Sequence, residues 1–168
     1  MILQTERLML RELTVDDAAH FYNLNTDPLV IKYTGDPPFD NIGHAYSFLK
    51  QYEQYKKYGY GRWAVIRKED KEWLGWCGLK YEKEYKETDI GYRFYRKYWN
   101  KGYATEAAKA SLEYGLNKLN LKTIVGRAMK ENPASIRVFE KIGMSYVEDF
   151  IYEGAPAVLY NIKGSSKE

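Results

Sequence analysis

Several residue types and patterns that define whole classes of protein are scarce in this chain of 168 residues. The single cysteine, Cys77, excludes an internal disulfide and a zinc site built from several cysteines. No uncharged apolar run reaches the length of about 18 residues that a transmembrane helix needs. The N-terminal segment M-I-L-Q-T-E-R-L carries charges where a signal peptide needs apolar residues. We therefore expect a cytoplasmic protein with no membrane partner.

An excess of charge of one sign is also lacking. The 26 basic and 23 acidic residues leave a net charge of +3, which is too small to argue for a nucleic-acid partner. Neither His20 nor His44 has partners at metal-ligand spacing, so we expect no metal. The composition is that of one globular domain, which we place at residues 1–163, followed by a frayed tail at 164–168.

Hydrophobic residues alternate in some segments and recur every three to four residues in others, which distinguishes strands from helices. The pattern predicts, in chain order, a strand at 7–13, a helix after Thr14, a helix at 41–57, strands at 62–67, 72–81 and 87–95, a long helix from 104, a strand at 122–129, a short helix between Asn132 and Gly143, and strands at 145–152 and 158–163. Short connections make the three middle strands an antiparallel meander. This order predicts an α+β domain.

The strongest local signal is R-F-Y-R-K-Y-W-N-K-G-Y-A-T-E-A, residues 93–107. Ahead of the long helix it holds four basic residues, namely Arg93, Arg96, Lys97 and Lys101. Gly102 then opens the helix, and the unpaired N–H groups and positive dipole end of a helix attract anions. The segment predicts a pyrophosphate site, with a solvated basic turn as the alternative.

Other phosphate and nucleic-acid motifs fit less well. The chain contains neither G-x-x-x-x-G-K-[ST] nor G-x-G-x-x-G. The segment K-G-Y-A at 101–104 imitates the start of an RNA-recognition strand, but T-E-A follows it and the periodicity is helical. These departures disfavour nucleic acid as a partner.

Two motifs connect the chain to a known family. W-N-K-G-Y-A-T-E-A resembles the acetyl-CoA pyrophosphate loop, Q/R-x-x-G-x-G/A, of the GNAT N-acetyltransferase superfamily. Its wider form, Y-W-x-x-G-Y-A-T-E-A, is similar to the RimJ/RimL branch, which acetylates protein N-termini. N-P-A-S-I-R-V-F-E-K-I-G-M at 132–144 resembles a second motif of that branch, and the opening T-E-R-L-M-L-R also fits. The resemblance covers nearly the whole chain in the right order.

The resemblance implies a GNAT-like mixed sheet in which two parallel strands splay apart around the cosubstrate acetyl-CoA. These would be the strand that ends at Phe94 and the strand at 122–129. The cosubstrate contacts carried over from the family are Phe94, Trp99, Asn100, Lys101, Gly102, Tyr103, Ala104, Thr105 and Asn132. Trp99 departs from the superfamily's Gln or Arg, but a contact through the main chain tolerates that change.

Acetyl transfer needs a base for the ammonium proton, and the departing thiolate gains from a proton donor. The donor tyrosine of many superfamily members aligns with Phe139, which has no hydroxyl. The RimJ/RimL pattern offers Ser135 as the donor, while its position in a well-capped helix is also explained by structure alone. Asp89, on the strand before the loop, is the candidate base, and Glu87 and water are the alternatives.

These motifs predict an acetyl-CoA-dependent N-acetyltransferase that acts on a primary amine, which in the RimJ/RimL branch is a protein N-terminus. The alternatives are an enzyme for a small amine, either a polyamine or an aminoglycoside, and a non-catalytic module that binds CoA or RNA. The resemblance places the acceptor against the two early helices, the loop at 26–40 and the final strands. We expect a monomer or a homodimer.

Overall fold

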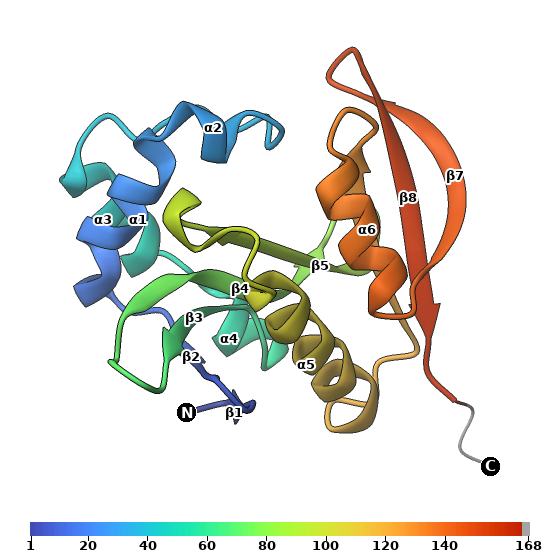
Figure 1. Cartoon of the computed structure of the whole chain (residues 1–168), viewed down its shortest axis with the longest axis horizontal. Coiled ribbons are helices and arrows are strands. Elements are labelled where there is room, and N and C mark those ends of the chain that lie inside the picture. The colour runs from blue at the N-terminus through green and yellow to red at the C-terminus, as the bar shows by residue number, and fades with distance from the viewer. Residues whose placement is uncertain (166–168) are drawn as a thin grey trace.

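The computed structural model describes residues 1–165, and one twisted sheet of eight strands forms its centre (Figure 1). The strands lie in the order β1-β2-β3-β4-β5-β6-β8-β7. Their bounds are β1 Leu3–Gln4, β2 Leu8–Glu12, β3 Arg62–Arg67, β4 Trp73–Glu82, β5 Glu87–Phe94, β6 Thr123–Met129, β7 Ser145–Tyr152 and β8 Ala155–Lys163. Neighbouring strands are antiparallel except β5 and β6, which are parallel.

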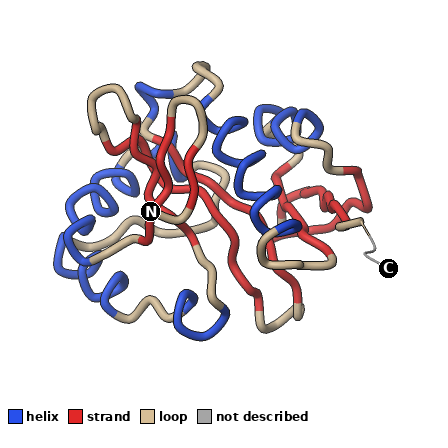
Figure 2. The backbone as a smooth tube through the Cα atoms, turned by 90° about the horizontal axis from the view of Figure 1, so that it is seen from below, coloured by secondary structure: helices blue, strands red, loops and turns tan. Residues whose placement is uncertain are grey.

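Helices lie on both sides of this sheet (Figure 2). Their bounds are α1 Ala18–Thr26, α2 Pro28–Ile31, α3 Ile42–Lys50, α4 Gln54–Tyr58, α5 Tyr103–Asn117 and α6 Pro133–Lys141. Helix α1 packs on α3 and contacts β4, whereas α5 packs along β4, β5 and β6. The predicted α+β fold class is therefore confirmed.

Two buried clusters fill the two faces of the sheet. Val65 of β3 belongs to the cluster under α5 with Leu112, and its neighbour Ala64 belongs to the cluster under α1 with Phe21. Adjacent side chains of a strand point to opposite faces, so α5 and α1 cover opposite sides of the sheet. The fully buried Ala107 has little bulk, which lets α5 lie close to the strands.

Capping residues set the helix boundaries as predicted. Thr14 and Asp17 form a capping box around a short 3-10 turn that leads into α1. Asn132 Oδ1 accepts a hydrogen bond from Ser135 N at 3.4 Å at the start of α6. Gly143 follows α6 with a φ of +94°, which favours glycine. These local predictions are confirmed.

The single helix predicted at 41–57 is wrong, because the chain forms α3 and α4 with a break between them. Near the break, Tyr52 Oη accepts a hydrogen bond from Arg62 N at 2.8 Å, and Tyr55 Oη donates to Arg62 O. These bonds hold both tyrosines against β3, and such tertiary contacts override local helix propensity. The pattern also misses β1, α2 and a 3-10 turn at Arg96–Tyr98.

The tail predicted at 164–168 is described only in part, because residues 166–168 lie outside the described residues. Gly164 N donates to Lys122 O at 2.9 Å, so this first tail residue is bonded to the rest of the chain. Over residues 1–165, no helix combines the length and the apolar character needed to cross a bilayer.

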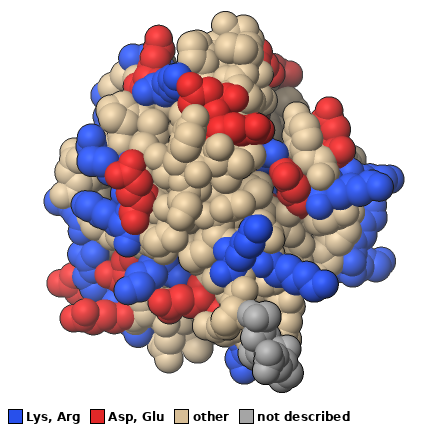
Figure 3. All heavy atoms as spheres, turned by 90° about the vertical axis from the view of Figure 1, so that its right-hand side faces the viewer, with Lys and Arg blue, Asp and Glu red and all other residues tan. Residues whose placement is uncertain are grey.

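Strand β7 forms one edge of the sheet and is largely exposed. Its exposed apolar side chains include Tyr146, Val147 and Ile151. Figure 3 shows this side of the molecule, where residues other than Lys, Arg, Asp and Glu occupy the middle and Lys and Arg lie on both flanks.

Candidate active site

The two parallel strands meet at a single pair of residues, Asp89 of β5 and Val125 of β6. Strand β5 continues to Phe94 and β6 continues to Met129 beyond that pair. The strands therefore splay apart, as predicted. A cleft of about 1360 Å³ extends from this splay.

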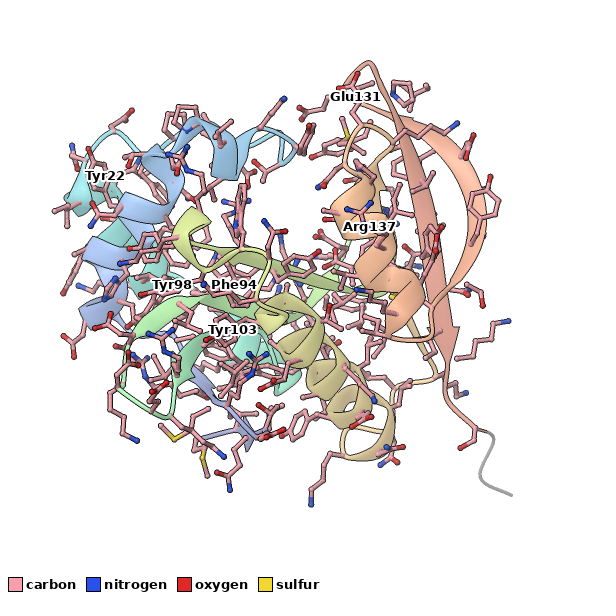
Figure 4. The ribbon with its side chains drawn as sticks, in the orientation of Figure 1. Tyr22, Phe94, Tyr98, Tyr103, Glu131 and Arg137 are labelled. Carbon is pink, nitrogen blue, oxygen red and sulfur yellow. The ribbon has the colours of Figure 1, made fainter. Side chains whose placement is uncertain are left out.

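Residues from distant parts of the chain form the walls of the cleft (Figure 4). Phe94, Tyr98 and Tyr103 lie together where β5 meets α5. Arg137 on α6 and Glu131 on the loop before it lie across the gap. A molecule in the cleft would thus touch both halves of the splayed sheet.

The backbone of β5 presents polar groups to the splay. Tyr95 N donates to Leu74 O on β4, so the residues that alternate with Tyr95, namely Phe94 and Tyr92, direct their N–H and C=O groups away from β4. Trp99 Nε1 donates to Phe94 O at 2.9 Å and occupies that carbonyl. The backbone of Phe94, a predicted cosubstrate contact, thus faces the cleft with its carbonyl already hydrogen-bonded. The backbone of Tyr92 faces the cleft as well.

The loop before α5 presents unpaired N–H groups. Asn100 and Gly102 have φ values of +62° and +81°, which turn the chain sharply at the start of the helix. The first bond of the helix runs from Glu106 N to Gly102 O, so the N–H groups of residues 103–105 precede the helical ladder. Successive free N–H groups at a helix start form an anion site.

Most of the predicted cosubstrate positions line the cleft. They are Phe94, Trp99, Asn100, Gly102, Tyr103, Ala104, Thr105 and Asn132. Lys101 is not a lining residue, and its carbonyl accepts a hydrogen bond from Arg7 Nη1 at 3.0 Å. Whether these positions bind the cosubstrate stays a prediction.

The turn between β1 and β2 bonds to this loop and to the first turn of α5. Arg7 Nε donates to Glu106 Oε1 at 2.8 Å, and Thr5 Oγ1 donates to Glu106 Oε2 at 2.6 Å. The same Arg7 reaches Lys101 O, so one arginine bonds both the loop and the first turn of α5. The opening T-E-R segment therefore holds the start of α5 and the loop before it from about 100 residues away in sequence.

The four basic residues ahead of α5 do not all gather at the loop, although the sequence pattern suggests that they do. Arg93 turns to the opposite side of the cleft, where its Nη2 lies 2.9 Å from Asp36. Arg96 Nε pairs with Asp27 at 3.1 Å. Arg137 of α6 lines the cleft instead, and only the folded arrangement of α6 beside the splay reveals it.

Two hydroxyl groups meet at the splay. Tyr92 Oη lies 3.1 Å from Ser135 Oγ, and Asn132 Nδ2 donates to the same Ser135 oxygen at 3.0 Å. Burial raises the pKa of Tyr92 to about 12, so its hydroxyl stays protonated at neutral pH. Asn132 thus has a second role besides the cap, and Tyr92 is a candidate that the sequence pattern did not reveal.

Phe139 is buried in the position that aligns with the superfamily tyrosine. Its ring packs on Tyr160 with centroids 5.6 Å apart. The ring also lies so close to Gly126 that a Cβ there would be 2.8 Å from its Cζ. Phe139 therefore packs between α6 and β6, and it also lines the cleft.

Both candidate bases are ion-paired with arginines from other strands. Asp89 Oδ1 lies 2.7 Å from Arg62 Nη2, and Glu87 Oε2 lies 2.5 Å from Arg127 Nη2. Asp89 lines the cleft at the point where the strands part. The geometry therefore places Asp89 closer to the splay than Glu87, which is not a lining residue.

Cys77 and His20 stand apart from this chemistry. Cys77 is fully buried, and burial raises the pKa of its thiol to about 12, so a thiolate nucleophile is excluded at neutral pH. His20 stacks on Trp73 with centroids 4.7 Å apart. Burial lowers the pKa of His20.

Comparison with known proteins agrees with this geometry. The acetyltransferase (GNAT) domain family matches residues 7–145. The p20 protein of Bacillus licheniformis, named as an uncharacterized N-acetyltransferase, is 33% identical over 142 residues, which cover 83% of this chain and 80% of p20.

Solved structures share the fold. The crystal structure of a GNAT-family acetyltransferase from Bacillus anthracis has a TM-score of 0.81 at 31% identity and covers 96% of this chain and 97% of that one. Spermidine N-acetyltransferase from Vibrio cholerae, solved in complex with CoA and spermine, has a TM-score of 0.81 at 19% identity and covers 95% and 96%.

The mixed sheet, the splayed parallel pair and these matches define an acetyltransferase. The chain belongs to the GNAT acetyltransferase family. The predicted GNAT fold is thereby confirmed, and so is the prediction of an acyltransferase enzyme.

Proposed function

We propose that this chain transfers the acetyl group of acetyl-CoA to a primary amine, and that the amine is a protein N-terminus. The observation that carries the proposal is the splay at Asp89 and Val125, because an anion-binding loop, two hydroxyls and a carboxylate all surround the cleft that begins there. The similarity of the two sequence motifs to the RimJ/RimL branch supports the choice of a protein N-terminus.

The cleft has the chemistry that acetyl-CoA requires. The N–H groups of residues 103–105 suit the pyrophosphate, and an added Cβ at Gly102 would meet no atom closer than 3.4 Å, so a ligand can approach the backbone. Arg137 supplies a cation across the gap. The N–H and C=O groups of Tyr92 both face the splay, so they suit the amides of the pantetheine arm.

The acceptor nitrogen attacks the thioester carbonyl carbon, so a C–N bond forms and the C–S bond breaks. Ser135 is proposed to donate its hydroxyl proton to the departing sulfur, while Tyr92 at 3.1 Å passes a proton to Ser135 and regains one from water, and Asp89 later releases the amine proton to water. Asn132 holds the Ser135 oxygen in place. Asp89 is proposed to take the proton that the amine loses, with Glu87 or water as the alternative acceptor of that proton.

A small-amine substrate is the second candidate, since a polyamine enzyme from Vibrio cholerae shares the fold. The test measures release of free CoA with peptides, polyamines and aminoglycosides, and each peptide is paired with its N-acetylated form. Release that needs a free peptide N-terminus supports the proposal. Release with polyamines alone supports the small-amine candidate, and tight acetyl-CoA binding without release from any amine indicates a non-catalytic module.

A further inference from the structure

The acceptor side of the cleft has a floor made of one indole and two guanidinium groups. Arg62 from β3 and Arg93 from β5 lie over the ring of Trp76, with their Cζ atoms 5.3 and 5.2 Å from its centroid. Both arginine side chains are largely buried, with exposed fractions of 15% and 10%. These three residues are called the cationic floor below.

The backbone leaves space for the Arg62 guanidinium group of the cationic floor. Arg62 Nη1 donates to Gly78 O at 2.8 Å, and its Nη2 reaches the carboxylate of Asp89 on β5. A Cβ at Gly91 would lie 2.7 Å from Arg62 Nη2, so a side chain there would displace the guanidinium. Arg62 thus crosses from β3 to the point where the strands part, within one hydrogen bond of the proposed base.

The floor has hydrogen-bond donors left over. Arg93 donates to Asn25 at 2.7 Å and to Asp36 at 2.9 Å, but its buried Nε has no partner among residues 1–165. Trp76 Nε1 is likewise buried and has no partner within that part of the chain. A buried donor without an acceptor is costly, so this region favours a ligand that brings oxygen atoms.

Three of the five carboxylates that line the cleft are ion-paired, and the other two, Glu84 and Glu131, are in no ion pair among residues 1–165. Asp89 pairs with Arg62, Asp36 pairs with Arg93, and Glu82 lies 3.3 Å from Lys80. A polycation would need unpaired carboxylates in this region, because burying an ammonium group without a partner is costly. The cationic floor instead has hydrogen-bond donors without acceptors in the part of the chain that the structure describes, which suits a ligand with oxygen atoms rather than a polycation.

Aromatic side chains line the same cleft. Phe21 of α1, Phe39 of the following loop and Phe48 of α3 pack together, with neighbouring centroids 5.5–5.9 Å apart, and all three line the cleft. An apolar side chain on the acceptor would find its counterpart in this wall.

We infer that the acceptor is an α-amino carbonyl compound, either a free amino acid or the first residue of a peptide, with an apolar side chain. The cationic floor binds the oxygen atoms beside the amine, and the aromatic wall receives the side chain. This inference rests on the proposed acetyl transfer and narrows its substrate class. It predicts that spermidine-like polycations are poorer acceptors than such a compound.

The test compares L-phenylalaninamide, L-phenylalanine, phenethylamine and spermidine as acceptors at saturating acetyl-CoA. Phenethylamine has the same ring and amine as the two amino-acid compounds but no carbonyl group. After correction for the fraction of free amine, we expect kcat/KM for the better of the two carbonyl compounds to exceed that for phenethylamine at least tenfold. Equal or better use of phenethylamine or spermidine overturns the inference, although it leaves acetyl transfer standing.

Substitutions in the cationic floor test whether it causes the preference for a carbonyl compound over phenethylamine. Arg93→Met should reduce the ratio between the carbonyl compound and phenethylamine at least fivefold, Arg93→Lys should reduce it less, and neither should change acetyl-CoA affinity. Arg96→Met is the matched control, because Arg96 also pairs with an aspartate but does not line the cleft. A ratio that survives Arg93→Met in a folded protein overturns the role of the floor.

Calorimetry with N-acetyl-L-phenylalaninamide measures binding without turnover. Wild-type protein should bind this product at least fivefold more tightly than N-acetylphenethylamine, and Trp76→Phe, which keeps a ring and removes the N–H, should lessen the difference. Loss of acetyl-CoA binding and of transfer to every amine would instead overturn the proposed function itself.

Discussion

The anion site before α5 can be tested by a charge at Gly102. This residue has a φ of +81°, a conformation that alanine adopts at a cost of roughly 1–2 kcal/mol but that asparagine and aspartate tolerate better. Gly102→Asn and Gly102→Asp have side chains of nearly equal size. The difference between the two variants therefore isolates the charge from bulk and from backbone strain.

The expected magnitude follows from the surroundings of Gly102. A carboxylate about 5 Å from one phosphate charge costs about 3 kcal/mol at an effective dielectric constant of 20. Arg7 Nη2 lies 3.4 Å from the position of an added Cβ, so it offsets part of that repulsion. We expect Gly102→Asp to bind acetyl-CoA at least tenfold more weakly than Gly102→Asn, which is about 1.4 kcal/mol.

Calorimetric titration with acetyl-CoA measures both affinities, and thermal unfolding checks that both variants are folded. The difference should shrink as salt is added, because the repulsion is electrostatic. Equal affinities of two folded variants would refute the placement of the pyrophosphate at this loop. A Gly102→Asn protein that has already lost all affinity would show that bulk dominates and would refute the argument from charge.

Three further predictions concern the proton transfers and the loop support. Ser135→Ala should lower kcat more than it lowers acetyl-CoA affinity, and Tyr92→Phe should have the same effect to a smaller degree. Steady-state kinetics measures kcat and calorimetry measures the affinity. A variant that retains the full rate would contradict the role of its hydroxyl. Asp89→Asn should cost roughly 10² to 10⁴ in rate near neutral pH with an alkylamine acceptor, whose pKa is near 10.4, and about tenfold at most with an α-amino acceptor. That loss should shrink as pH rises through the acceptor's own pKa, which is about 7.7–8.0 for an α-amino group, so a pH–rate profile without such a trend contradicts the role. Arg7→Met should weaken acetyl-CoA binding several-fold, because it removes hydrogen bonds of about 1 kcal/mol each from the loop, whereas Arg96→Met should leave the affinity unchanged.

Local chemistry predicted much of the fold. Thr14, Asn132 and Gly143 stop or start elements through side-chain caps or backbone conformation, which depend on a few neighbouring residues. The long helix from residue 103 follows from its own periodicity. The split between α3 and α4 could not be predicted in this way, because it accompanies hydrogen bonds from Tyr52 and Tyr55 to a strand that comes later in the chain.

The predicted and missed parts of the site differ in the same manner. The loop at 99–105 is contiguous, so a motif was enough to find it. Tyr92 looks like one more residue of an alternating strand until α6 brings Ser135 within 3.1 Å. The pairing of Arg62 with Asp89 joins strands 27 residues apart, and the run of four basic residues gave no sign that Arg93 would turn away from the loop.

The last prediction concerns the proton donor that the superfamily pattern expects at residue 139. Phe139→Tyr is a conservative change that places a hydroxyl at this position. The ring is 3% exposed, however, and its Cζ lies close to the backbone of Gly126. The added oxygen would crowd a packed site and would need a buried partner, so we expect a loss of about 1–3 kcal/mol in the free energy of unfolding.

The same variant should not restore activity to Ser135→Ala, because the hydroxyl in this protein reaches the splay from Tyr92 on β5 rather than from the middle of α6. Urea unfolding and CoA-release rates of Phe139→Tyr, alone and combined with Ser135→Ala, measure both effects, and Phe139→Leu serves as the apolar control. Recovery of at least half of the wild-type rate in the combined variant would show that residue 139 can reach the thioester sulfur after all, and Tyr92 would then be only a packing residue.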